Sequence, residues 1–528
     1  MLLAAVLSAL AAAPTPTPQP TPTVRLPELR THVKHVFIIY QENHSFDNYF
    51  GTYPGAENLA SPLAQAHGFR QLDPIGKKPV TPFKITDPDT ASPQQGREIT
   101  LSKMNGGKMD AFVATQERVS SAKFDQAGAR NVGLMTMAHY DCDTIPFLWE
   151  YAQRFVLFDH IFSGITGPST PNAIALIAGQ ADNITDDADP AYGPYSKKED
   201  KYQVPQRYAT LMLALSGGDA TKVTQETQGV GQDLGATAAS GRAPIPWGWY
   251  QEGYVSPTLA LPGYVTHHNP VQYFAYLRQN DVFWHNVQSV QALLPQLREG
   301  TLPDRGIFYI KGGSRNGFGW KPANPDPSVQ ANFLGDDDHA GPDDSDAQIA
   351  ESFVATYVNA IARSKYWDDS VIIITWDDPG GFYDHVPPPQ FPNCGDGHPC
   401  GDGPRVPLLV ISPYARSGAV VPAVGDQISI LKLAEGLFDL PTLASLPDER
   451  ARPIAPRDAD TAMTDLLGAF DPARLNGSEP PILSSYAEIP DDVVNTFPSA
   501  MNCRTLGLAP EVLPNAPSTP PPGFRVRF

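Results

Sequence analysis

The sequence has few cysteines, no block rich in lysine and arginine, and no apolar run long enough to span a bilayer. Because there is no basic block, the sequence lacks the positive patch expected of a nucleic-acid-binding protein. The net charge of −19 also disfavours adsorption to anionic lipid. No internal repeat is visible. The 528 residues, with 41% hydrophobic content, are enough to bury the core of a globular protein.

The four cysteines allow three pairings. Cys394 and Cys400 flank a loop rich in glycine and proline and are close enough in sequence to close a small disulfide ring. A zinc loop that uses His398 is the alternative. If the ring forms, Cys142 and Cys503 either pair with each other or stay free. Disulfides would indicate an oxidising compartment.

The first 23 residues do not resemble part of a packed domain. Residues 2–13 are apolar and end in small side chains, as a signal peptide does, although the basic start is lacking. Residues 14–23 alternate proline with threonine or glutamine, which favours an extended linker. We therefore expect a secreted or periplasmic protein, with a misassigned start codon as the alternative.

Four short apolar runs without polar alternation predict strands that are buried on both faces, as in a parallel sheet. They are residues 36–40, 307–310, 371–376 and 407–412. Residues 345–367 carry an apolar stripe at helical spacing, with Ser345 placed as the N-cap. Strand, helix and strand in this order predict an α/β fold, with a mostly parallel central sheet sandwiched by helices.

We expect one domain over residues 24–500 and a poorly packed C-terminal tail over residues 501–528. Residues 182–261 are rich in Gly, Pro, Asp and Thr and lack periodicity, which favours an insertion that caps one end of the sheet. The aromatic side chains of residues 245–264 either line an entrance or pack this insertion onto the core.

Acidic and amide side chains follow two of the predicted strands. Glu42 and Asn43 come after the first strand, and Asp377 and Asp378 come after a later one, just before a Pro-Gly-Gly turn. Because ligands bind outside the carboxyl ends of strands in open α/β sheets, these positions predict a site. The oxygens are hard donors of the kind that hold Mg²⁺, Ca²⁺ or Mn²⁺, and sometimes Zn²⁺. The alternative is that each acid caps a helix or lies in a solvated loop.

A third segment, GPSTPNAIALIAG over residues 167–179, predicts a helix that begins beside two hydroxyl groups. Pro171 suits the first helical position, and Gly179 suits the end. Ser169 or Thr170 then lies at a helix N-terminus, where free N–H groups favour an anion such as phosphate. A hydroxyl there that also binds a divalent cation becomes a nucleophile. An ordinary Ser/Thr N-cap is the alternative.

Six sequence blocks stand in order along residues 33–443. They are QENHSFDNYFGTYPGA, GPSTPN, HHNPVQYF, DDDHAGPDD, TWDDPGGFYDHVPPP and GDGPRVPLLVISPYARSG. Together they resemble the phosphoesterase family of bacterial phospholipases C and related acid phosphatases, within the alkaline phosphatase superfamily. The resemblance implies an alkaline phosphatase-like fold and the metal-dependent hydrolysis of phosphate esters through a covalent phosphoserine.

The six blocks contain residues of this chain that stand where the family has its site residues. The implied ligands of a divalent metal ion are Glu42, Asn43, Ser169, Asp377 and Asp378. The third residue of GPSTPN matches the family nucleophile, so the resemblance favours Ser169 over Thr170 in that role.

The histidines divide into two groups. His268 and His339 match family histidines that contact the phosphoryl group or its leaving oxygen, so either is a candidate general acid. We expect His44, His267 and His385 to be ordinary loop histidines, although His385 could support the metal loop.

Three departures from the phospholipase C pattern favour an acid phosphatase-like phosphomonoesterase. Asn172 is followed by Ala173 where many relatives have arginine, a histidine upstream of the block over residues 105–112 is missing, and no pair of extra β-rich modules follows. A phospholipase C that cleaves phosphatidylcholine-type diesters is the alternative. The expected partner is a small phosphate ester or a phospholipid.

Two further possibilities are less favoured. A non-catalytic binding protein on the same scaffold would have no need of the hydroxyl that GPSTPN retains. A sulfatase-like hydrolase would need the signature CxPxR, which the sequence lacks.

Overall fold

A computed structural model describes residues 24–194, 205–219, 228–278, 285–391, 400–511 and 519–527. The signal-like segment over residues 1–23 lies outside the described residues, as do Cys394 and His398, so the predicted ring between Cys394 and Cys400 does too. Within the described ranges, no helix is both long enough and apolar enough to cross a membrane.

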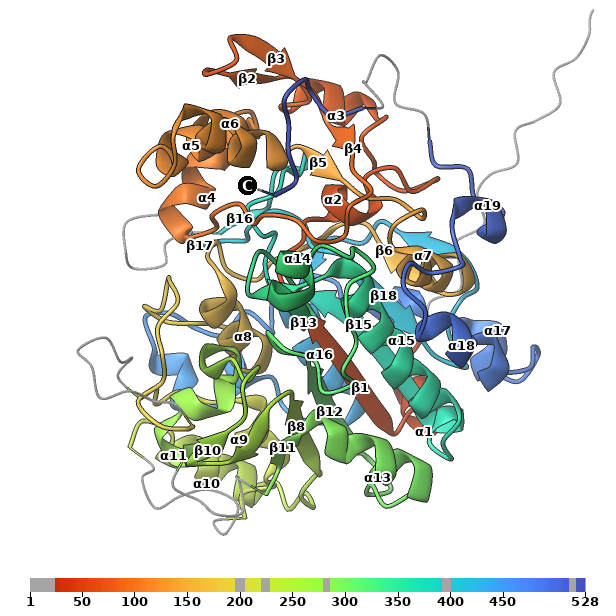
Figure 1. The fold of residues 1–528 in the computed structure, drawn as a ribbon. Coiled ribbons are helices and arrows are strands. Elements are labelled where there is room, and N and C mark those ends of the chain that lie inside the picture. Colours follow the sequence, from red (N-terminus) through yellow and green to blue (C-terminus); the bar gives the residue numbers. More distant parts are fainter. Residues whose placement is uncertain are drawn as a thin grey trace, which may run out of the picture.

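An eight-stranded sheet forms the centre of the molecule (Figure 1). In spatial order its strands are β11 (Val287–Ser289), β8 (Trp247–Gln251), β12 (Gly306–Lys311), β1 (His35–Gln41), β15 (Ser370–Trp376), β18 (Leu408–Ile411), β6 (Val156–Phe158) and β19 (Ala419–Val421). The helices that flank it include α8 (Ser169–Ala178), α15 (Ala347–Ala362) and α16 (Ile428–Leu437). The predicted α/β fold with a mostly parallel sheet is confirmed.

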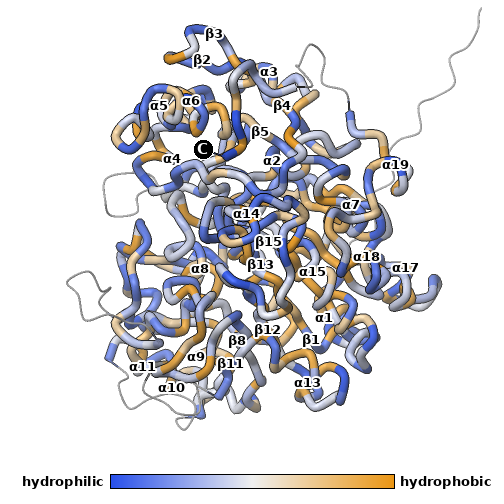
Figure 2. The backbone as a smooth tube through the Cα atoms, in the orientation of Figure 1, coloured by the Kyte–Doolittle hydropathy of each residue, from blue (hydrophilic) through white to orange (hydrophobic). Residues whose placement is uncertain are grey.

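β1 lies in the middle of the sheet because its residues are apolar on both faces. All seven residues of β1 and all seven of β15 are buried. β1 pairs in parallel with β12 on one side and with β15 on the other, and Figure 2 shows hydrophobic stretches along these central strands. Parallel pairing brings the carboxyl ends of the three strands to one edge of the sheet, at Gln41, Lys311 and Trp376.

β18 differs from the prediction of a parallel strand. It runs antiparallel to β15 and to β6. The described parts of residues 377–407 contain no crossover helix, so the chain re-enters the sheet from the edge at which β15 left it. A continuous apolar run indicates burial on both faces but does not fix the direction of a strand.

The long predicted helix is present as α15, but Ser345 is not its N-cap. Asp346 caps the helix, and its side chain accepts hydrogen bonds from the backbone amides of Gln348 and Ile349 at 2.8 and 3.2 Å. Ser345 instead donates its hydroxyl to Asp337 Oδ1 over 2.7 Å. Both residue types suit an N-cap, so sequence preference alone could not separate these neighbours.

The region over residues 182–261 supplies a strand of the central sheet. β8 pairs in parallel with β12 and β11, and its Trp247 and Trp249 are buried. The ring of Trp249 stacks on Tyr309 of β12 with centroids 5.1 Å apart. These aromatic side chains therefore pack onto the core.

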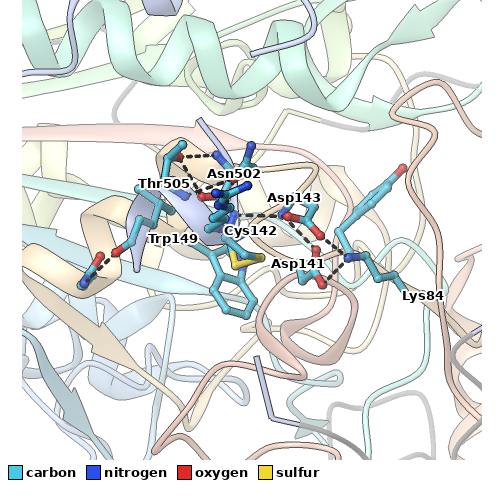
Figure 3. Close-up of a disulfide and its surroundings, with 12 residues drawn as sticks. Lys84, Asp141, Cys142, Asp143, Trp149, Asn502 and Thr505 are labelled. Carbon is cyan, nitrogen blue, oxygen red and sulfur yellow. Dashed lines mark hydrogen bonds and ion pairs between the residues drawn. A yellow bond between two sulfur atoms is a disulfide. The ribbon is translucent and has the colours of Figure 1, made fainter. Parts of the chain in front are cut away.

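The described part of residues 501–527 is largely exposed, with Cys503 as its one buried residue, and it is joined to the domain at separate points. Cys503 forms a disulfide with Cys142 across 361 residues, and its amide donates to Asp143 Oδ1 over 3.2 Å (Figure 3). Residues 519–527, here called the C-terminal strap, follow. Within the strap, the Val526 carbonyl accepts a hydrogen bond from the Ala91 amide at 2.8 Å. The proline-rich sequence of the tail did not predict these contacts, because each one joins the tail to a segment far away in the chain.

Candidate active site

Three polar segments meet at the carboxyl edge of the sheet. β1 runs into Glu42 and Asn43, β15 runs into Asp377 and Asp378, and α8 begins there with Ser169. All five side chains are buried. The Ser169 hydroxyl lies 2.9 Å from Glu42 Oε2 and 3.5 Å from Asp378 Oδ2. The five residues that the sequence analysis grouped as metal ligands therefore lie together.

Backbone turns direct these side chains towards one another. Asn43 has a φ of 57°, in the left-handed region that asparagine tolerates better than most residues. The predicted Pro-Gly-Gly turn follows Asp378, with φ of 62° at Gly380. A Cβ atom at Gly380 would lie 2.0 Å from the Asn43 carbonyl oxygen. Only glycine fits where the two turns approach so closely.

α8 begins at Ser169 rather than at Pro171, and it ends at Gly179 as predicted. Pro171 fits in the first turn because the N–H that it lacks has no partner within the helix. The Asn172 side chain donates to the carbonyls of Gly167 and Pro168 at 3.0 and 2.9 Å, which fixes the loop in front of Ser169.

The Asn43 amide is at the centre of the carboxylates. One of its terminal atoms lies 3.0 Å from Asp377 Oδ1 and 3.1 Å from both Glu42 Oε2 and Asp378 Oδ2. Its other terminal atom lies 2.7 Å from His339 Nε2 and 3.0 Å from Gln95 Nε2. In the structure the amide oxygen faces the carboxylates, so that four oxygens lie together on that side. This is the orientation in which Asn43 could bind a metal, because only a cation could hold four oxygens together.

Lys311 and His268 approach Glu42 from the other side. Lys311, at the end of β12, forms a buried ion pair with Glu42 Oε1, and His268 Nδ1 lies 3.2 Å from the same oxygen. Burial and the charge of Asp377 raise the pKa of Glu42 well above its usual value, against the opposing effect of Lys311. Burial, with nearby positive charge, lowers the pKa of His268 well below its usual value.

His339 contacts the Asn43 amide and also pairs with an acidic side chain. Its Nδ1 lies 2.9 Å from Asp344 Oδ2. Burial alone would lower the pKa of His339, but Asp344 and Glu42 raise it well above the usual value. The ion pair with Asp344 therefore favours the protonated form of His339 more than burial alone would.

The donor set fits a divalent cation. Three buried carboxylates and one buried lysine leave two negative charges when all are ionised. Burial and Asp377 raise the pKa of Asp378, so this side chain also favours a proton unless a cation offsets its charge. Among the described residues, Asp377 Oδ2 is buried with no hydrogen-bond partner. Carboxylate, amide and hydroxyl oxygens are the ligands of hard divalent ions.

Two other groups of potential ligands are closely spaced, but each already holds a cationic side chain. Asp47, Asp384 and His385 form the first group. Arg405 donates to Asp47 Oδ1 at 3.0 Å and to Asp384 Oδ1 at 2.8 Å. In the second group, Lys84 contacts two aspartates and the sulfur of Cys503 is in the disulfide. Neither group offers a free set of ligands.

The structure brings together all the residues proposed from the sequence for metal binding and catalysis, and it adds two that were missed. His268 contacts Glu42, and His339 contacts Asn43. Lys311 was missed although it directly follows the strand predicted over residues 307–310, so the strand-end rule that located Glu42 would have found it too. Gln95 was missed because its loop has no motif and reaches the site only through the fold.

Comparison with known proteins identifies the family. The family model described as "Phosphoesterase family" matches residues 33–441. The non-hemolytic phospholipase C of Burkholderia pseudomallei is 28% identical over 491 residues, covering 86% of this chain and 61% of its own. The phospholipase C A of Mycobacterium tuberculosis (strain H37Rv) is 22% identical over 542 residues, covering 93% and 89%. The chain thus spans less than two thirds of the Burkholderia relative's length.

Solved structures give weaker likenesses. A protein of the alkaline phosphatase superfamily from Vibrio parahaemolyticus has a TM-score of 0.29 at 12% identity, covering 60% of this chain and 65% of its own. The phosphonate monoester hydrolase of Agrobacterium radiobacter also has a TM-score of 0.29 at 12% identity, covering 77% and 74%. TM-scores this low support no conclusion about function.

A divalent cation should stabilise the folded protein, and Asp377→Asn should weaken that effect. At about 100 times Kd, binding adds about 2.7 kcal/mol to the free energy of unfolding. The variant removes a charged ligand, so the rise in Tm on adding Mn²⁺ should shrink. Without the cation the variant should be at least as stable as wild type, because a repulsion between carboxylates is gone. Thermal unfolding with Mn²⁺ and with chelator measures both effects.

Asp465→Asn, at an exposed aspartate, is the matched control and should keep the full shift in Tm. If Mn²⁺ raised the Tm of Asp377→Asn as much as that of wild type, Asp377 would not be a metal ligand.

Stability should fall in alkaline solution through His385. Burial alone would lower the pKa of His385, but Asp47 and Glu57 raise it from 6.5 to about 9. Its contribution is therefore complete below pH 6.5 and is lost as the pH rises through about 9. The shift corresponds to roughly 3 kcal/mol. Urea unfolding should show this loss in wild type, whereas His385→Asn should be less stable at low pH and nearly flat across the range. An equal slope in both proteins would contradict the assignment.

Proposed function

The chain belongs to the phosphoesterase family, and on that basis we propose that it hydrolyses phosphate esters with a divalent metal ion and Ser169 as the nucleophile. The observation that carries the proposal is the Ser169 hydroxyl at the start of α8, within 2.9 Å of Glu42 and 3.5 Å of Asp378. A purely structural site would not need a hydroxyl in that place.

Ser169, Glu42, Asn43, Asp377 and Asp378 are the proposed metal ligands. A bound divalent cation would neutralise charge on a nonbridging phosphate oxygen and lower the pKa of the Ser169 hydroxyl. Lys311 keeps one positive charge beside Glu42, which limits the repulsion among the acids before the substrate arrives.

In the first step, Ser169 Oγ forms a bond to phosphorus, and its proton moves towards Glu42 Oε2, which accepts its hydrogen bond. The bond from phosphorus to the alcohol oxygen breaks on the opposite side. We assign the proton for the departing alkoxide to His339, because its ion pair with Asp344 favours the protonated form of this histidine. His268, with its lowered pKa, is left to contact a phosphate oxygen.

In the second step, a water molecule attacks the phosphorus of the phosphoserine. The bond from Ser169 Oγ to phosphorus breaks, phosphate is released, and neutral His339 accepts the proton of the attacking water. Glu42 returns its proton to the leaving Ser169 Oγ, and the site is back in its starting state.

Two substrate classes are candidates. The departures at Asn172-Ala173 and upstream of residues 105–112 favour a phosphomonoester. A second candidate, phospholipase C action on phosphatidylcholine-type diesters, is favoured by the 28% identity to a relative of that name. Both share the same serine and metal chemistry, so they differ only in what the surrounding pocket accepts.

We also propose that the protein works outside the cytoplasm. The disulfide between Cys142 and Cys503 supports this, because such bonds persist in oxidising compartments.

Ser169→Ala should leave the melting curve near that of wild type and lower kcat by at least about a thousandfold. Thr170→Ser, next to it on α8, is the matched control and should stay active. Both variants and wild type are assayed with and without chelator on p-nitrophenyl phosphate, p-nitrophenyl phosphorylcholine and phosphatidylcholine. Cleavage of the monoester alone would support the phosphatase, and release of diacylglycerol would support the phospholipase C. Near-normal turnover by Ser169→Ala would refute the covalent mechanism.

A further inference from the structure

Lys103 is a fully buried lysine that the proposed reaction does not use. It lies near the end of α4 (Arg97–Met104), the helix that begins just after Gln95 (Figure 1). Lysine is almost never fully buried unless its amino group has partners. The partners of Lys103 show what this side chain does for the candidate active site.

The amino group of Lys103 donates hydrogen bonds to two loops that are far apart in the sequence. Its Nζ is 2.7 Å from the carbonyl oxygen of Gln94 and 2.9 Å from that of Gly381. A Cβ atom at Gly381 would lie 2.4 Å from the Gln94 carbonyl oxygen, so only glycine allows the loops to approach this closely. Lys103 therefore joins the loop before α4 to the loop after β15.

The loop after β15 holds Asp378, one of the proposed metal ligands. The backbone amide of Gly380 donates to Asp378 Oδ1 over 2.7 Å, so the place of Gly380 sets the direction of this carboxylate. Gly381 is the next residue, and its carbonyl is the one that Lys103 holds. Lys103 thus restrains the turn that orients Asp378.

The loop before α4 brings Gln95 to Asn43, another proposed ligand. Gln95 Nε2 lies 3.0 Å from the terminal atom of Asn43 that faces away from the carboxylates, which is the amide nitrogen. Gln95 Oε1 is buried and has no hydrogen-bond partner among the described residues. When the Gln95 amide turns over, this oxygen accepts a hydrogen bond from the Asn43 nitrogen. Gln95 then holds Asn43 in the orientation in which its oxygen faces the metal.

The two hydrogen bonds of Lys103 do not depend on its charge. Burial lowers the pKa of Lys103 well below its usual value, and the charge of Asp378 opposes this effect. A neutral amino group still has two N–H bonds, one for each carbonyl. Lys103 can therefore connect the two loops in either protonation state.

We propose that Lys103 is a positioning residue of the metal site, which fixes Asp378 and Asn43 relative to each other by holding the carbonyls of Gly381 and Gln94. The inference rests on the proposed metal-dependent function. Lys103 touches neither the ion nor the substrate and acts through Gly380 and Gln95. An apolar side chain of the same length would leave two buried carbonyls without this donor, so the loops would no longer be joined.

Lys103→Met keeps the length of the side chain and removes its donor. In isothermal titration calorimetry on the full chain, the Kd for Mn²⁺ should rise by about tenfold or more, as is typical when a group that orients a metal ligand is lost. At saturating Mn²⁺, kcat should fall while KM for the ester that wild type cleaves stays within about twofold, because the substrate contacts are intact. Lys108→Met, at an exposed lysine just after α4, is the matched control and should change none of these values.

Gln95→Met tests the same connection at its other end. It should also raise the Kd for Mn²⁺, and this effect should be smaller in Lys103→Met than in wild type, because the first change already releases the loop that carries Gln95. A purely structural role would lower Tm and leave Kd unchanged. An unchanged Kd in Lys103→Met, or effects of the two changes that simply add, would overturn the inference and leave the hydrolysis intact.

Wild type alone decides if Lys103→Met does not fold. Because Lys103 joins the two loops, Mn²⁺ should slow amide hydrogen exchange in residues 94–96 and in residues 380–383 together. Slower exchange in only one of these loops would overturn the inference. A wild-type protein that binds no Mn²⁺ and cleaves no ester would reject the proposed function, and the positioning role with it.

Discussion

The burial of like charges at one edge of the sheet is the constraint on which the rest of the structure depends. Glu42, Asp377 and Asp378 lie within hydrogen-bond reach of one amide, out of contact with water. Such a group is unfavourable unless protons, donors or cations offset it. Lys311 offsets part of it. The remaining charge favours a divalent ion, so the feature that destabilises the cation-free protein is also the feature that would prepare the serine for attack.

A rigid frame holds this group in place. β1 and β15 pair along seven positions, which fixes the residues that follow each strand relative to one another. Behind them, the fully buried Arg405 joins Asp47 and Asp384, and His385 connects Asp47 to Glu57. This second buried charge cluster is balanced by its own arginine. It can therefore support the loop after β15 without a bound ion.

The sequence predicted a feature correctly where a single short segment both contains the sequence pattern and forms the structure. The buried strands, the turn after Asp378 and the hydroxyl at the start of α8 could each be predicted from local pattern. The direction of β18 could not, since an apolar run looks the same in either direction. The capping of α15 by Asp346 rather than Ser345 depended on tertiary contacts. The contacts of Gln95 and of the C-terminal strap join segments far apart in the chain, and no local signal marks them.

Anomalous X-ray scattering from crystals grown with Mn²⁺ would test the central claim most directly. The account predicts a strong peak bonded to carboxylate oxygens of Glu42, Asp377 and Asp378 and to the amide oxygen of Asn43, with Ser169 Oγ facing the ion. A peak among Asp47, Asp384 and His385 instead, or no peak beside Ser169 at saturating Mn²⁺, would contradict it.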